Sequence, residues 1–177
     1  MLIGVLVGLG VYGFEEVANA MLDVVRGGSV ALMVFSPAVG LVLAAAIIRF
    51  GPTPRSRSTA DEYILSVHDR QRRIPFGQFV TRIGAAIATL GFGGGLGFEG
   101  PAVLIGAGTA DLLSQRIKRI VKVDTQALLV AGAAAAIAAV FKAPATGAVF
   151  ALEVPYRSDM ARHQLLPALV GAASGYV

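Results

Sequence analysis

The chain has 177 residues, of which 55% are hydrophobic and only 15% charged, and it contains no cysteine. An ordinary soluble domain is about 25% charged, so this composition excludes a disordered chain and is not that of a typical cytosolic enzyme. The absence of cysteine excludes disulfide frameworks and thiolate zinc sites. The net charge is +4, but the basic residues cluster between apolar segments with no aromatic platform among them. Such clusters are typical of loops that flank membrane spans and argue against a nucleic-acid partner.

The first two apolar segments predict a helical hairpin in a membrane. Residues 1–25 form one helix with acidic residues toward its end, and residues 29–48 contain no charge. Twenty helical residues extend about 30 Å, which is enough to cross the hydrocarbon core. The pair Gly27 and Gly28 forms the turn between them. We therefore expect membrane lipid to be a partner of the protein.

A polar interval over residues 51–78 follows, and it contains one predicted helix. The stretch STADEYILSVH has Ser58 or Thr59 as a candidate N-cap, with Asp61 and Glu62 in its first turn. Side-chain oxygens at the N-cap accept hydrogen bonds from first-turn amides, and acidic residues there complement the helix dipole. The interval closes at Pro75.

The rest of the chain consists of shorter apolar pieces. They comprise residues 83–98, 101–110, 126–141, 145–152 and 164–177. Several fall short of the roughly 20 residues that a straight span needs. Short pieces broken by Gly or Pro predict tilted, discontinuous or re-entrant helices, which transporters use to build sites near the membrane midplane. Re-entrant helices without any site are the alternative. The predicted fold class is an all-α integral membrane protein.

Several familiar motifs carry no function in this chain. Two stretches match G-x-G-x-x-G, at residues 8–13 and 95–100, but neither follows a strand in a βαβ unit. His68 and His163 lie far apart, so no metal site is expected. No Ser/His/Asp arrangement is evident, and we expect the protein not to be an enzyme. An intramembrane enzyme using Glu99 or His68 and a purely structural membrane scaffold remain the rival classes.

The segment GFEGP, residues 97–101, is the most informative. A carboxylate within a membrane segment costs roughly 2.5–3.5 kcal/mol on insertion scales and is a functional hypothesis by default. Pro101 suits the first turn of a new helix, which places Glu99 at a helix N-terminus, where free amides and the dipole favour an anion. Glu99 would then be a tethered anion that competes with a permeating one. The alternative is an acidic residue that only stabilises its helix.

With these residues in place, the sequence resembles the CLC family of chloride channels and proton-coupled chloride antiporters. GFEGP is similar to the family signature G-x-E-G-P, and AGAAAAIAAVFKAPATGAVFALE, residues 131–153, is similar to a second signature. The resemblance covers nearly the whole chain. It implies the first half of an inverted-repeat CLC transporter fold, with chloride as the transported ion and no cofactor.

The resemblance also implies roles for single residues. Glu99 matches the external gating glutamate. Gly97, Phe98, Gly100 and Pro101 match part of the anion-binding site at a helix N-terminus. The family's other anion-contacting motif, G-S-G-I-P, aligns with residues 57–61, where only the serine is retained, so an anion contact and an N-cap are equal alternatives for Ser58. In this interpretation the anion is held by helix N-termini, with no full positive charge in the pore.

The residue after Glu153 bears on the mechanism. Many antiporters of the family have two consecutive glutamates at this point, the second of which accepts protons from the inner side. The second position is Val154 in this chain, and valine cannot carry a proton. The substitution favours a voltage- or pH-gated channel, with a proton-coupled antiporter as the alternative.

The length implies a fragment of the family's transmembrane domain. Family members have two inverted halves and are more than twice as long, and the second half supplies a G-x-F-x-P segment and a tyrosine at the anion site. Neither is found in residues 1–177, and Tyr176 is not in the position of that tyrosine. We therefore expect a single partial domain over residues 1–177, a homodimer with one pore per subunit for the complete protein, and the cell membrane of a prokaryote.

Overall fold

The computed structural model describes residues 1–52, 56, 58–69, 71–117, 124–156 and 160–176, and the regular structure of these residues is helical throughout. Eight α-helices and one short 3-10 helix lie within them. In chain order they are α1 Leu2–Arg26, α2 Val30–Phe50, α3 Thr59–His68, α4 Phe76–Gly91, α5 Glu99–Ile117, α6 Thr125–Phe141, α7 Pro144–Glu153, η1 Arg162–Gln164 and α8 Leu165–Gly175. The predicted all-α fold is confirmed.

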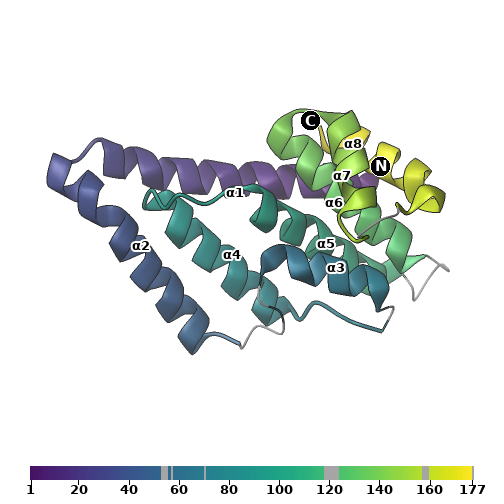
Figure 1. Cartoon of the computed structure of the whole chain (residues 1–177), viewed down its shortest axis with the longest axis horizontal. Helices are drawn as coiled ribbons and strands as arrows, with labels where there is room; N and C mark the ends of the chain where they lie inside the picture. Colours follow the sequence, from purple (N-terminus) through teal and green to yellow (C-terminus); the bar gives the residue numbers. More distant parts are fainter. Residues whose placement is uncertain (53–55, 57, 70, 118–123, 157–159, 177) are drawn as a thin grey trace.

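The first two helices form the predicted hairpin and are long and apolar enough to cross a membrane. The turn ends at Ser29, whose hydroxyl caps α2 by accepting the amide of Leu32 at 3.3 Å. Figure 1 shows α2 on one side of the molecule and α6 to α8 on the other, with α1 extending between them. Buried residues of α2 are confined to Ser36, Gly40 and Ala44. Its other faces expose large apolar side chains, as a lipid-facing helix does.

The core is centred on α6, which packs against α1, α5, α7 and α8. Residues 129–139 of this helix are all buried, and most of them are alanine. Small side chains allow neighbouring backbones to approach closely, which is the usual basis of helix association in lipid. One close crossing joins α5 and α6, because a Cβ added to Gly106 would lie 2.6 Å from the carbonyl carbon of Gly132.

Replacing Gly106 with alanine is expected to destabilise the protein. The new methyl group meets the backbone of Gly132, which cannot move without separating α5 from α6. Overpacking of this kind costs about 1–3 kcal/mol. The matched control is Gly13→Ala on α1, where an added Cβ has nothing within 4 Å. We expect a lower midpoint of thermal unfolding in detergent only for Gly106→Ala, and equal midpoints for the two variants would contradict the close crossing.

The helix that begins at Glu99 is longer than the apolar piece predicted there, residues 101–110. The helix after Glu99 does not stop at Asp111 but continues to Ile117. The Asp111 carboxylate is buried and satisfied, because it accepts Arg73 Nη1 at 3.1 Å and the amide of Ile74 at 2.9 Å. A paired charge can remain inside a helix that an unpaired charge would end. These bonds also attach the segment before α4 to α5.

Candidate functional site

The site predicted around Glu99 lies at the start of α5. Glu99 is the first residue of this helix, and the carbonyl of Phe98 accepts the first helical hydrogen bond, from Ala102 at 2.9 Å. Pro101 has no amide hydrogen to leave unpaired. The amides of Glu99 and Gly100 remain as first-turn donors with no carbonyl one turn earlier in the helix. The predicted placement of Glu99 at a helix N-terminus is therefore confirmed.

Glycine residues leave space for neighbouring side chains on both sides of Glu99. The Glu99 carboxylate folds back over the Cα of Gly97, so a Cβ on Gly97 would overlap Oε2 and lie 2.9 Å from Cδ. On the other side, a Cβ on Gly100 would lie 2.6 Å from the hydroxyl oxygen of Thr59. The two glycines thus admit the carboxylate on one side and the first residue of α3 on the other. The N-termini of α3 and α5 consequently meet.

A capping box begins α3. The hydroxyl of Ser58 accepts the amide of Asp61 at 3.1 Å, and the Asp61 carboxylate accepts the amide of Ser58 at 3.0 Å. Of the two roles considered for Ser58, an N-cap and an anion contact, the structure shows the N-cap. Two first-turn amides, those of Thr59 and Ala60, lie outside the capping box. Ser58 does not line the cavity described next, whereas its neighbours Ser56 and Thr59 do.

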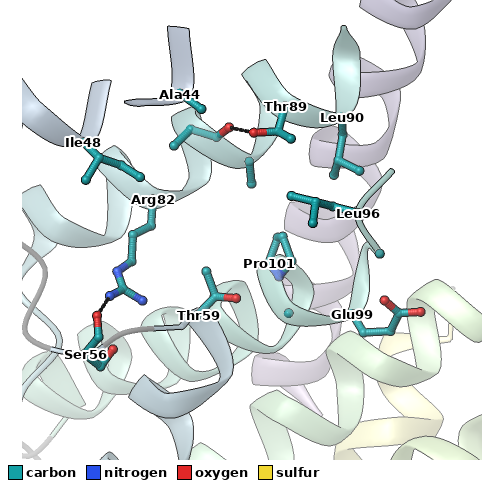
Figure 2. A pocket seen from close by; sticks show the side chains of 14 residues that line it. Ala44, Ile48, Ser56, Thr59, Arg82, Thr89, Leu90, Leu96, Glu99 and Pro101 are labelled. Atoms are coloured by element: carbon teal, nitrogen blue, oxygen red, sulfur yellow. Dashed lines mark hydrogen bonds between the residues drawn. The ribbon is translucent and has the colours of Figure 1, made fainter. Parts of the chain in front are cut away.

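A cavity of about 460 Å³ lies where the two helix N-termini meet. In Figure 2 the Glu99 carboxylate and the Arg82 guanidinium lie at opposite sides of the view, with Thr59 and Pro101 between them. The upper wall in this view comes mainly from α4 and includes Thr89 and Leu90. Of the predicted site residues, the cavity brings together Gly97, Glu99, Gly100 and Pro101.

Phe98 and Val154 lie apart from this cavity. The ring of Phe98 packs edge to face on Phe14, with centroids 5.8 Å apart, and it lines a neighbouring cavity of about 360 Å³ beneath the α1–α2 hairpin. Val154 follows the last residue of α7, where its amide bonds to the carbonyl of Phe150, and its side chain packs against the core.

Most of the lining residues were not predicted as site residues, and Thr59 and Arg82 are among them. Arg82 comes from α4 and is 7% exposed. The signal for Arg82 was available in the sequence, since a lone charge within an otherwise apolar helix is itself a functional hypothesis. The guanidinium is part of the cavity wall, whereas the interpretation of the sequence expects no full positive charge in the pore.

Comparison with known proteins finds a matching family and several relatives. The family model described as voltage gated chloride channel matches residues 39–177. The chain is 36% identical over 107 residues to a chloride/fluoride channel protein of Pseudomonas syringae pv. tomato, covering 60% of this chain and 23% of that protein. It is 30% identical over 141 residues to a putative chloride channel protein ClcB-like of Ralstonia nicotianae, covering 78% of this chain and 33% of that protein.

A solved structure has the same arrangement of helices. The crystal structure of a CLC-type fluoride/proton antiporter matches with a TM-score of 0.80 and 27% identity, over 99% of this chain and 43% of that one. The chain thus spans a third or less of the two bacterial relatives and less than half of the solved antiporter. The family whose model matches this chain consists of channels and transporters rather than enzymes. With the family model matching well over half of its residues, the chain is an integral membrane protein that belongs to the voltage gated chloride channel family.

Proposed function

We propose that this chain forms one part of a pathway for chloride across the membrane, with Glu99 as its gate. The observation that carries the proposal is the position of the Glu99 carboxylate at the N-terminus of α5, in the wall of a cavity that the N-terminus of α3 also reaches. Helix N-termini bind anions through free amides and the helix dipole. A carboxylate at such a point competes with a free anion for the same donors.

The gate works through charge. While ionised, Glu99 occupies the positive end of α5 and repels an arriving anion. On protonation the carboxyl becomes neutral, the attraction to the amides weakens, and the site is open to chloride. Gly97, Gly100 and Pro101 shape this end of the helix, whereas Phe98 lies at the adjoining cavity and would influence the entrance. Ser58 acts through the α3 cap. Binding of this kind is weak enough for the ion to leave again.

We propose that the complete protein is a homodimer in the cell membrane of a prokaryote, with residues 1–177 as one part of each transmembrane domain. The bacterial source of two relatives supports the prokaryotic membrane. The share of the solved antiporter that this chain covers, 43%, supports the partial domain. No cofactor enters the proposal, since the gate needs only a proton and an anion.

A proton-coupled antiporter is the second candidate, and one observation favours it: the solved relative is described as a fluoride/proton antiporter. The same comparison makes fluoride a second candidate ion. Val154 favours the channel, because a valine at this position cannot pass protons inward from the cavity.

The deciding experiment uses liposomes that contain the purified protein to which this chain belongs. An outward gradient of chloride, and in a parallel arm of fluoride, is applied while external pH and anion are both recorded. We expect anion efflux without proton uptake, because the chain has no ionisable group at Val154. Proton uptake in fixed proportion to anion efflux would replace the channel by an antiporter. Efflux of neither halide above that of empty liposomes would refute the proposed function.

A further inference from the structure

Arg82 is the buried cation of the cavity wall, and its terminal nitrogens are already engaged. Nη1 donates to the carbonyl of Ser58, and Nη2 donates to the carbonyl of Ser56. Figure 2 shows the side chain extending from α4 to Ser56. The third nitrogen of the guanidinium, Nε, is buried and has no hydrogen-bond partner within the described residues. The guanidinium therefore links α4 to the segment that leads into α3.

The charge of Arg82 has no direct counterion among the described residues. The charged groups that face it are Glu62, Asp61 and Arg72. The Glu62 carboxylate is paired with Arg72 at 3.1 Å, and that of Asp61 is turned to the amide of Ser58 in the capping box. No carboxylate of the described chain lies within ion-pair distance of Arg82. Neutral carbonyls orient a guanidinium but do not cancel its charge, and a buried charge without a counterion is costly.

We propose that Arg82 is the positioning residue of the anion site: its two terminal nitrogens hold the N-terminus of α3 at the cavity, and its uncompensated charge attracts the halide that Glu99 excludes. The inference rests on the proposed function and adds to it the source of the attraction. The halide supplies the missing negative charge while it occupies the cavity. Ionised Glu99 supplies that charge within the same cavity when the halide is absent.

The two parts of this role separate in two variants. Lysine keeps the charge but is a single point donor, and it cannot span two carbonyls as the planar fork of arginine does. Glutamine keeps a hydrogen-bond donor but has no charge. If the charge attracts the anion, Arg82→Lys preserves the apparent KM for halide flux, whereas Arg82→Gln raises it. If the guanidinium also holds the N-terminus of α3, both variants lower the maximal flux.

The experiment measures initial flux against halide concentration in liposomes containing the complete protein, with chloride and fluoride in separate arms. For Arg82→Gln we expect the apparent KM to rise by about tenfold or more, as the loss of a charged partner implies. For Arg82→Lys we expect it to stay within about threefold of wild type, since the charge remains. The control is Arg49→Gln, which removes a positive charge from the exposed end of α2, outside the cavity lining. The control should leave the KM unchanged. A rise for one halide alone identifies the ion that the site accepts.

Three results would overturn the inference. The first is an unchanged KM for Arg82→Gln. The second is an equal rise for Arg82→Lys and Arg82→Gln, because it would mean that shape and not charge is required. The third result applies if Arg82→Gln does not fold, so that only Arg82→Lys can be measured. In that case a KM of Arg82→Lys that differs from the wild-type value by more than about threefold overturns the inference. Loss of all halide flux in the wild-type protein would instead refute the proposed function, so the two failures are distinguishable.

Discussion

Glu99→Gln is expected to raise anion flux at neutral pH to the level that the wild-type protein reaches in acid, and to remove most of its pH dependence. Glutamine has the shape of a protonated glutamate and carries no charge, so it cannot compete with an anion for the first-turn amides of α5. Flux through the wild-type protein should increase as pH falls, because protonation removes the negative charge that competes with the anion. Halide flux from liposomes between pH 7.5 and pH 4.5 measures both effects.

The control for Glu99→Gln is Glu16→Gln, which makes the same chemical change on an exposed position of α1. It should leave the pH profile as it is in the wild type. If the protein is an antiporter instead, Glu99→Gln abolishes proton uptake while anion flux continues, since the residue at the helix N-terminus can no longer carry a proton. An unchanged pH profile in Glu99→Gln would be incompatible with Glu99 as the gate.

Gly97→Ala is expected to open the gate without altering Glu99 itself. The new methyl group occupies the space in which the Glu99 carboxylate lies, and a flexible carboxylate yields more readily than the backbone. Displacement of the carboxylate leaves the end of α5 free for an anion, so flux at neutral pH should rise toward that of Glu99→Gln. Gly95→Ala is a closely matched control, because a Cβ added at Gly95 has nothing within 4 Å.

A double-mutant cycle tests whether Gly97 acts through Glu99. Residues in contact show interaction energies of about 0.5–3 kcal/mol, whereas independent positions give additive effects. The double variant Gly97→Ala with Glu99→Gln should therefore have the same flux and pH profile as Glu99→Gln alone. Additive effects of the two substitutions, or a Gly97→Ala profile identical to that of Gly95→Ala, would contradict the arrangement of the carboxylate over Gly97.

Much of the fold could be predicted because its signals are local. The charge-free segment over residues 29–48, the glycine turn before it and the Ser58 cap each involve neighbours in the chain, and each is confirmed as α2, its turn and the start of α3. The continuation of α5 past Asp111 could not be predicted. Whether a carboxylate ends a membrane helix depends on its partners, and Arg73 and Ile74 come from a segment 37 or 38 residues earlier.

The same distinction holds within the site. Gly97, Glu99, Gly100 and Pro101 are contiguous, so one motif contains them all. Thr59 and Arg82 come from two other helices, α3 and α4, and only the packing of the helices brings them to the cavity. Phe98 belongs to the motif but faces the adjoining cavity. The motif therefore predicted where these residues lie along the chain. The packing of the helices determined which of their side chains line the same cavity.

By itself the sequence determined that this protein is helical, lies in a membrane and places one carboxylate at the start of a broken helix. Hydropathy, helix capping and the cost of a charge in lipid depend on residues near one another in the chain, and they require no knowledge of the fold. The tertiary structure alone decided that α3 and α5 meet at their N-termini and that a buried guanidinium from α4 completes the wall. These contacts depend on how closely backbones approach, which is set by glycines and alanines whose significance becomes evident only once the helices are packed.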